Sequence, residues 1–438
     1  MAGTGEKILV ISYYWPPSGG PGALRMTGWV KYLARAGWEP RVLTVENGEF
    51  PYPDPGLSES VPPDVSVHRV RAPQPFGLYK RLTGRKPDDS LPVGLLAGGG
   101  KGPAERIAGW IRANVFIPDA RTGWVGPATR EAARLIRSHG IRHVLISSPP
   151  HSAQLIGLRL RKRTDVRWIA DLRDPWTGFR HYQTAGRSRT AARCDARLER
   201  RVLRHADRVT TVSPALAGDF ERLGALRGRV HVLLNGFDPD DFGGEFPALP
   251  RRFRIVHTGN LVANQNPGVL WDGLSRLCDA LPGFASHLEI RLTGRVHPVI
   301  EEAIRIAGLS DALVLNPFRP HREILPEITG ASVLLVVIPQ TENNRGIVTG
   351  KLPEYIGSGR PVLVIGPADG DAAGIVRPLS NGWTVDYGDA EGCRDVLESL
   401  FRRWQADDLP VSEAGEREPF SRAAAVETLI GLMRDPGP

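Results

Sequence analysis

Both halves of the chain show the same alternation of short apolar runs and longer amphipathic runs, and this alternation limits the fold. Runs rich in β-branched residues predict strands at 7–12, 40–45, 65–70, 143–148, 167–172, 208–213, 230–235, 253–259, 287–294, 312–318, 331–339, 361–366 and 383–388. Amphipathic patterns predict helices at 23–37, 128–140, 268–281, 297–308 and 421–435. Strands that alternate with helices are typical of a parallel sheet covered on both faces. We therefore predict an α/β fold with two Rossmann-like, doubly wound parallel-sheet domains.

A break in this rhythm divides the two halves. Residues 236–252 are rich in Gly, Pro and Asp and lack periodicity, which is typical of a linker. We predict an N-terminal domain over 1–248, a C-terminal domain over 249–412, and a final segment, 413–438, whose helix packs back on the first domain. Ligands of open parallel sheets bind beyond the carboxyl ends of the strands. We therefore expect a ligand cleft between the two domains.

The composition indicates a globular protein of the cytoplasm. Of the 438 residues, 41% are hydrophobic and 24% are charged, as in ordinary globular domains. No apolar run is long enough to predict a membrane-spanning helix, and the first residues do not resemble a secretion signal. The three cysteines lie far apart, which fits neither a disulfide framework nor a zinc site.

The net charge of +8 leaves two interpretations open. It can reflect a proteome rich in arginine, or it can indicate an anionic partner such as a phosphorylated substrate or a membrane surface. The chain has no zinc-finger spacing and no RNA-binding motif, so we do not expect nucleic acid as a partner.

Residues 73–120 contain many Pro and Gly residues and form either a surface loop or an insertion that contacts an acceptor or a membrane. The second interpretation rests on apolar and basic residues that would suit anionic lipid. These residues are Phe76, Leu78, Tyr79, Lys80, Arg81, Arg85, Lys86, Leu95, Leu96 and Trp110.

A glycine-rich loop, YYWPPSGGPGALR (13–25), follows the first predicted strand. Gly19 and Gly20 would let a ligand approach the backbone, and the helix that begins near Ala23 would present free N–H groups. The loop is not a GxGxxG fingerprint, so a dinucleotide site is disfavoured. A tight turn that binds no ligand is the alternative.

Two further motifs follow predicted strands of the first half. In SSPPHSAQLIG (147–157), we expect His151 to stay neutral near a helix N-terminus and to hydrogen-bond a sugar hydroxyl. In ADLRDPWTGF (170–179), Asp174 beside an aromatic side chain suits carbohydrate. The alternatives are a surface histidine and an Asp–Arg pair that braces a loop.

In the second half, GIVTGKLPEYIGSGRPVLVIGP (346–367) places a short helix between two strands. Backbone N–H groups of Thr349, Gly350 and Lys351, together with the Lys351 ammonium, would bind an anion. Glu354 lies on the same helix face and would accept hydrogen bonds from a vicinal diol. A cation for diphosphate and a carboxylate for ribose together indicate a nucleoside diphosphate, and a surface ion pair between the two side chains is the alternative.

The order of several motifs resembles glycosyltransferase family 4, and the resemblance covers nearly the whole chain. The motifs that carry the resemblance are, in chain order, the glycine-rich loop, His151 after a strand, ADRVTTVSPAL (206–216), NGFD (235–238), HTGNL (257–261) and GKLPEYIGSGRPVL (350–363). SSPPHS and ADLRDPW are similar to members that build bacterial surface polysaccharide. The resemblance implies a GT-B fold and transfer of a sugar from a nucleotide sugar with retention of configuration.

The resemblance also implies a set of site residues. Glu354 matches the second acid of the family's Glu-x7-Glu pair, and the first position is Gly346 here. The family's diphosphate-binding Arg and Lys correspond to Asn260 and Asn266, and we expect Lys351 and Arg345 to supply the missing charge. His151 and Lys351 are the predicted catalytic residues. The predicted substrate-binding residues are Gly19, Gly20, Asp174, Asn260, Arg345, Thr349, Gly350, Leu352 and Glu354.

The implied reaction needs no metal and no cofactor, because a positive site can stabilise the departing diphosphate directly. The implied partners are a nucleotide-diphosphate sugar and a glycan, lipid-linked or small-molecule acceptor, with the enzyme in the cytoplasm or at the inner face of the membrane. Two other functions stay open: a nucleotide-sugar epimerase with the same fold, and a non-catalytic protein that binds phosphorylated glycan or anionic membrane.

Overall fold

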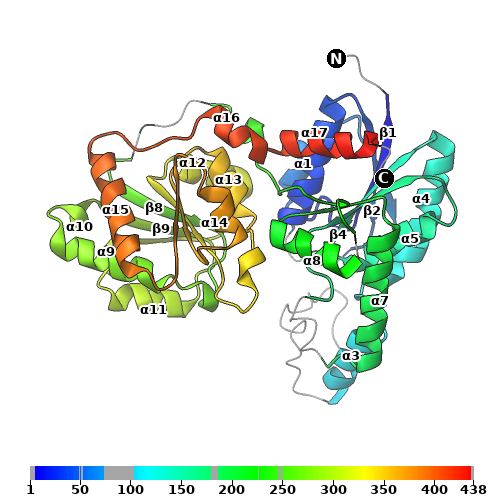
Figure 1. The fold of residues 1–438 in the computed structure, drawn as a ribbon, viewed down its shortest axis with the longest axis horizontal. Coiled ribbons are helices and arrows are strands. Elements are labelled where there is room, and N and C mark those ends of the chain that lie inside the picture. Colours follow the sequence, from blue (N-terminus) through cyan, green and yellow to red (C-terminus); the bar gives the residue numbers. More distant parts are fainter. Residues whose placement is uncertain are drawn as a thin grey trace. The chain divides into compact units, whose positions relative to one another are not determined.

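The chain divides into two compact units in the computed structural model (Figure 1), which describes residues 5–48, 50, 53–73, 103–178, 186–224, 226–244, 248 and 250–435. Unit 1 comprises Met1–Val212, Leu216–Leu233 and Val426–Pro438. Unit 2 comprises Ser213–Ala215 and Leu234–Ala425.

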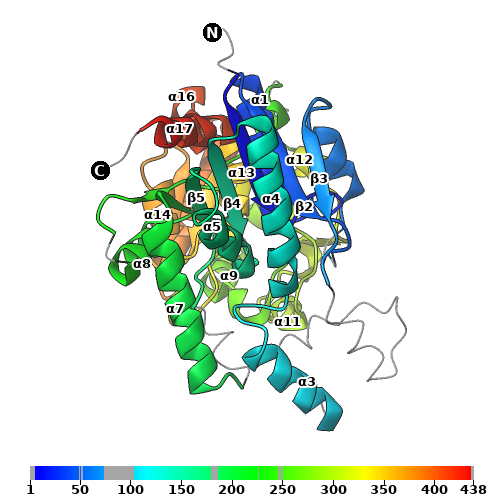
Figure 2. The same cartoon turned by 90° about the vertical axis from the view of Figure 1, so that its right-hand side faces the viewer.

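In unit 1, the described residues form a parallel seven-stranded sheet in the order β3-β2-β1-β4-β5-β6-β7. The strands are β1 (Lys7–Ser12), β2 (Glu39–Val45), β3 (Ser66–Val70), β4 (His143–Ser148), β5 (Arg167–Leu172), β6 (Arg208–Thr211) and β7 (Val230–Val232). The helices are α1 (Pro21–Arg35), α3 (Pro103–Asn114), α4 (Val125–His139), α5 (Gln154–Leu160), α7 (Arg189–His205), α8 (Pro214–Gly224) and α17 (Arg422–Arg434). Figure 2 shows α4 in front of this sheet and α1 behind it, so both faces are covered.

In unit 2, the described residues form a parallel six-stranded sheet in the order β10-β9-β8-β11-β12-β13. The strands are β8 (Phe253–Thr258), β9 (Leu288–Thr293), β10 (Leu313–Asn316), β11 (Val333–Val337), β12 (Val362–Ile365) and β13 (Gly382–Val385). The helices are α9 (Gly268–Ala280), α10 (Phe284–His287), α11 (Pro298–Ile306), α12 (His321–Thr329), α13 (Lys351–Gly357), α14 (Asp371–Val376), α15 (Ala390–Gln405) and α16 (Ala414–Arg417).

Alternation of side chains along the central strands builds a core on each face of a sheet. In β11, Leu335 and Val337 join the cluster formed with α9 and α15, whereas Leu334 and Val336 join the cluster formed with α13 and α14. All four side chains are buried, as expected for a strand covered on both faces.

The strand order reverses beside the first strand of each unit. In unit 1, β1 lies between β2 and β4, and Ser12 at its end pairs with Ser147. In unit 2, β8 lies between β9 and β11. Loops diverge at such a reversal, which leaves room for a ligand at the carboxyl ends of the strands.

The boundary between the units lies earlier than the sequence-based boundary after residue 248. Residues 236–244 pack within unit 2, where a Cβ added to Gly357 would lie only 2.4 Å from Cγ of Phe237. The final segment is divided, since its residues up to Ala425 belong to unit 2 and Val426–Pro438 belong to unit 1. Of the proposed membrane-contacting residues in 73–120, those from Phe76 to Leu96 lie outside the described residues.

Candidate functional site

The glycine-rich loop of unit 1 lies against an arginine from the end of β5. Gly20 has φ of 85°, a backbone conformation that favours glycine, and it precedes α1 without a side-chain cap. A Cβ on Gly22 would stand 2.6 Å from Nη2 of Arg173, so the guanidinium occupies the space beside this loop. The Nε atom of Arg173 is buried and has no hydrogen-bond partner among the described residues. The sequence motif ADLRDPW contains this arginine, but its position was not predicted.

His151 lies after β4 and is buried, with 2% of its surface exposed. Its ring stacks on Trp176, with ring centres 5.1 Å apart and planes 9° apart. Burial first, and the charge of Arg173 second, lower the pKa of His151 to about 3. His151 is therefore neutral at physiological pH, as predicted, although burial rather than a helix dipole is the main cause. Its Nδ1 atom has no partner among the described residues.

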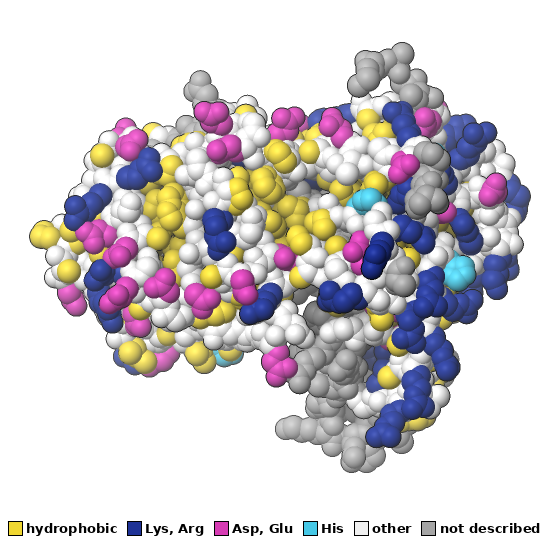
Figure 3. Space-filling model, viewed as in Figure 1, with side chains coloured by type: hydrophobic (Ala, Val, Ile, Leu, Met, Phe, Trp, Pro, Cys, Tyr) yellow, Lys and Arg dark blue, Asp and Glu magenta, His cyan; other side chains and the backbone are white. Residues whose placement is uncertain are grey.

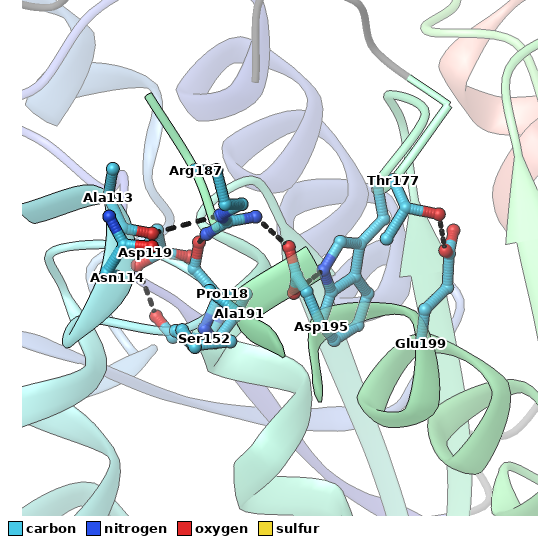
Figure 4. Close-up of polar contacts among 12 residues, drawn as sticks. Ala113, Asn114, Pro118, Asp119, Ser152, Thr177, Arg187, Ala191, Asp195 and Glu199 are labelled. Atoms are coloured by element: carbon cyan, nitrogen blue, oxygen red, sulfur yellow. Dashed lines mark hydrogen bonds and ion pairs between the residues drawn. The ribbon is translucent and has the colours of Figure 1, made fainter. Parts of the chain in front are cut away.

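A polar network fixes the residues on either side of this stacked pair (Figure 4). Asp119 accepts hydrogen bonds from the backbone N–H and the hydroxyl of Ser152, at 2.8 and 2.7 Å. Trp176 donates from its indole nitrogen to Asp195 at 2.7 Å, and Asp195 pairs with Arg187. The network thus holds the backbone next to His151 and the ring on which it stacks.

Glu199 is a residue of α7 and contacts the loop that follows β5, in which Trp176 lies (Figure 4). The hydroxyl of Thr177 donates to this carboxylate, which is buried at 1% exposure. Burial raises the pKa of Glu199 to about 6, and the hydrogen bonds from Thr177 only partly offset this effect. Glu199 therefore titrates near neutral pH, which no sequence pattern predicted.

Asp171, in the middle of the same motif, has a structural role. Its carboxylate pairs with the buried guanidinium of Arg25 at 2.9 Å. Ser147 and Thr210 donate to its two oxygens at 2.7 and 2.9 Å. An Asp–Arg pair does brace this region, but the arginine comes from α1 rather than from the motif.

In unit 2, Lys351 lies over the end of β8. A Cβ on Gly259 would stand 2.7 Å from Cε and 3.3 Å from Nζ of Lys351. Burial lowers the pKa of Lys351 to about 8, and the neighbouring Glu354 works in the opposite direction. Burial and the Lys351 charge together lower the pKa of His257 to about 3. The backbone N–H groups of Thr349, Gly350 and Lys351 donate to no acceptor in the described part of the chain.

Glu354 is accompanied by a histidine that the sequence reasoning did not single out. Nδ1 of His321 lies 3.6 Å from Glu354, and Nε2 of His321 lies 3.0 Å from Asp241. Burial lowers the pKa of His321, but the hydrogen bond to Asp241 and the charge of Glu354 outweigh burial, so the net pKa is raised. Burial raises the pKa of Glu354. A protonated His321 would therefore hold one side of the Glu354 carboxylate.

The remaining predicted residues occupy different environments. Gly19, Gly20, Thr349 and Gly350 are partly buried in their loops, and Asp174 and Asn260 are exposed. Oγ1 of Thr349 is buried without a partner among the described residues.

Two of the predicted residues have other roles. Leu352 has no exposed surface, and its N–H group donates to the carbonyl of Thr349, so its side chain belongs to the core. Arg345 is 73% exposed and pairs with Asp369 at 3.0 Å. Asn266, the position of the family's lysine, accepts a hydrogen bond from Trp271 at 2.8 Å.

Among the described residues, no group of three or more His, Cys, Asp or Glu side chains is arranged to hold a metal ion. Within the same residues, every helix is too short or too polar to cross a bilayer.

Solved structures define the fold class. Sucrose-phosphate synthase from Thermosynechococcus elongatus is similar with a TM-score of 0.63 and 16% identity, over 98% of each chain. HepE from Anabaena, in complex with UDP and glucose, has a TM-score of 0.60 and 15% identity, over 97% of this chain and 98% of that chain. A mutant of TarM from S. aureus has a TM-score of 0.58 and 9% identity, over 98% of this chain and 100% of that chain. The chain therefore has the GT-B fold of glycosyltransferases, as predicted.

A family model matches the first half of the sequence. Residues 19–236 match the model of the glycosyl transferase 4-like domain, so this part of the chain is similar to that family. The predicted resemblance to family 4 is thus confirmed. No curated protein matches the sequence.

Proposed function

We propose that the protein is a retaining glycosyltransferase that moves a sugar from a nucleotide-diphosphate sugar to a hydroxyl of a glycan, lipid-linked or small-molecule acceptor. In this proposal, unit 2 binds the nucleotide of the donor, and unit 1 binds the acceptor. The observation that supports this most strongly is the position of Lys351, whose ammonium lies over Gly259 beside backbone N–H groups that donate to no described residue.

The chemistry assigned to unit 2 is stabilisation of the leaving diphosphate. Negative charge grows on the diphosphate as the bond to the sugar breaks, and a fixed cation with oriented N–H donors lowers that barrier. Lys351, Gly350 and Thr349 supply these donors, and Glu354 accepts hydrogen bonds from the ribose hydroxyls. In this proposal, the reaction needs no metal and no cofactor.

The role assigned to His151 is to orient the donor sugar. Its neutral ring can accept or donate a hydrogen bond to a sugar hydroxyl without adding charge near the reacting carbon. The stacking on Trp176 fixes the plane of the ring, which limits the orientations available to the hydroxyl. The HepE structures in complex with UDP and UDP-glucose support a nucleotide-sugar donor.

We further propose that the enzyme acts in the cytoplasm at the inner face of the membrane, in the synthesis of polysaccharide. On α3 and just beyond it, Trp110, Ile111 and Val115 are exposed by 57, 40 and 60%. An arginine face on α7 consists of the exposed residues Arg189, Arg193, Arg197, Arg201 and Arg204. Figure 3 shows a band of basic side chains over this part of unit 1. Apolar side chains beside a basic face suit an anionic bilayer surface.

The donor can be tested with a panel of nucleotide sugars and thermal unfolding. A ligand at 100 times its dissociation constant should add about 2.7 kcal/mol to the stability of the protein. The donor found in this way is then incubated with candidate acceptors, and nucleotide release is measured. Lys351→Ala should abolish turnover while the protein stays folded, and unchanged turnover would remove Lys351 from the site.

The same assays separate the alternatives. An epimerase would convert the nucleotide sugar without any acceptor. A binding protein would bind glycan or vesicles and never release nucleotide. Sedimentation with vesicles tests the membrane proposal, which requires binding to anionic vesicles and little binding to neutral ones.

A further inference from the structure

A hollow lined by arginines lies at the edge of unit 1 opposite to His151. Its volume is about 310 Å³, and five arginines line it: Arg161, Arg167, Arg204, Arg208 and Arg229. Arg167 begins β5 and Arg208 begins β6, so the hollow lies at the amino ends of these strands. His151 follows the carboxyl end of β4. We call this hollow the arginine cavity.

Two carboxylates in the arginine cavity neutralise only part of its charge. Arg161 binds both oxygens of Asp207 at 2.7 and 2.8 Å. Arg208 binds Asp435 at 2.7 Å. Five arginines and two aspartates leave a formal charge of +3 among these side chains.

The three other arginines form no ion pair within the described residues. Arg167 donates to the carbonyls of Met433 and Asp435 at 2.8 and 2.9 Å. Arg229 donates to the carbonyl of Ala206. The Arg204 side chain is exposed and forms no hydrogen bond or ion pair with any described residue.

A structural role in capping helices explains part of this arrangement. The carboxyl ends of α5, α7 and α17 meet at the cavity, and each carries about half a negative charge. Three such ends offset about half of the formal +3, so a positive surplus remains. Capping also gives no reason for Arg204, whose guanidinium binds no carbonyl of the described residues.

We propose that the arginine cavity binds a phosphate-class anion, such as a diphosphate or the phosphate of a lipid head group. Guanidinium groups bind phosphate oxygens through paired, charge-assisted hydrogen bonds. Several of them around one hollow suit a ligand with more than one negative charge. The site is separate from the donor and acceptor sites proposed above and does not depend on them.

The experiment measures binding of inorganic pyrophosphate to the full chain by titration calorimetry. The Lys351→Ala variant is the reference protein, because it removes the other proposed diphosphate site. We expect saturable binding to this reference and a loss of at least tenfold in affinity when Arg204→Gln is added. The Arg204 side chain makes no hydrogen bond or ion pair with a described residue, so this variant should fold normally.

Arg197→Gln in the same Lys351→Ala background is the matched control, because it removes the same charge from α7 outside the cavity. It should leave the affinity within about twofold of the reference. Equal effects of the two substitutions would show a general charge effect and would overturn the proposal.

A second arm uses vesicles to distinguish the two sources of phosphate. If the natural ligand is a head group, vesicles that contain phosphatidic acid should bind more weakly after Arg204→Gln than after Arg197→Gln. If it is a soluble phosphate, only the pyrophosphate titration should separate the two variants. No difference between them in either arm would rule out the site.

Discussion

The ammonium-bearing chain of Lys351 fills the space that a side chain on Gly259 would need. A Cβ at Gly259 would lie 2.7 Å from Cε of Lys351, and Gly259 itself has φ of 92°. The glycine that follows β8 therefore leaves the space in which the lysine at the start of α13 approaches the end of the strand. This match suggests the first test.

Gly259→Ala should weaken nucleotide-sugar binding at least tenfold. The new methyl group would displace Lys351, and the positive φ would add backbone strain of about 1–2 kcal/mol. Gly268→Ala is the control, because a Cβ there meets nothing within 4 Å. The measurement is the dissociation constant of the donor identified in the thermal screen. Equal affinities for the two variants would show that the approach of Lys351 does not matter for binding.

Nucleotide affinity should fall as pH rises through about 8. The pKa of Lys351 is lowered from its usual value of 10.5 to about 8, because burial disfavours the charged form. In the free protein, Lys351 therefore loses its proton, and with it the positive charge, near pH 8. At higher pH, Lys351 must take up a proton when the nucleotide binds, which costs free energy. Each pH unit above 8 should then weaken binding by up to about tenfold.

Lys351→Arg is the control for this pH dependence. Arginine stays charged throughout this range, so the variant should bind with an affinity that changes little from pH 7 to 9.5. A fall in affinity that is the same for the two proteins would assign the pH dependence to another group.

The strands were predictable because each one carries its own signal. A run such as PVLVIG is buried on both faces of a parallel sheet, so it is apolar throughout and bounded by Gly or Pro. Ligands of open parallel sheets bind beyond the carboxyl ends of the strands, so the loops that follow the predicted strands were predicted to form the ligand edge. His151, Lys351 and Glu354 were selected for this reason, since each follows a strand.

The missed features depend on contacts between distant segments. Helix α7 was not predicted, because its buried face includes the carboxylates Asp195 and Glu199 rather than an apolar stripe. The partner of Glu354 is His321, which lies more than thirty residues earlier in the chain. The ion pair of Arg345, which we predict to bind phosphate, with Asp369 at the surface was also not foreseen. Local sequence spacing contains no information on such pairs.

Acid should destabilise the protein in part through His151. Its pKa is about 3 in the folded protein and 6.5 when free, so the unfolded chain binds a proton between these values and the folded protein does not. The stability contributed by the neutral ring is complete above pH 6.5 and is lost as pH falls toward 3. The full effect is about 5 kcal/mol.

His151→Phe tests this contribution because it keeps a ring to stack on Trp176 and cannot be protonated. The variant should lose less stability than the original protein between pH 6.5 and 4, measured by denaturant unfolding at each pH. His257 has a similarly lowered pKa and should still contribute to acid destabilisation of the variant. Parallel stability curves for the two proteins would contradict the assignment to His151.

Glu199→Gln should stabilise the protein at pH 8 and have little effect at pH 4.5. Burial raises the pKa of this carboxyl from 4.5 to about 6, so the folded protein disfavours the ionised form. The contribution of Glu199 to stability is therefore highest below pH 4.5 and declines as pH rises through 6, by about 2 kcal/mol in all. A glutamine oxygen can still accept the hydrogen bond from Thr177 but carries no charge.

Glu131→Gln is the control of opposite sign, because Arg134 lowers the pKa of Glu131 and makes its ionised form favourable. Unfolding curves at the two pH values should show a gain only for Glu199→Gln, and a loss of stability at pH 8 would mean that the Glu199 charge supports the fold.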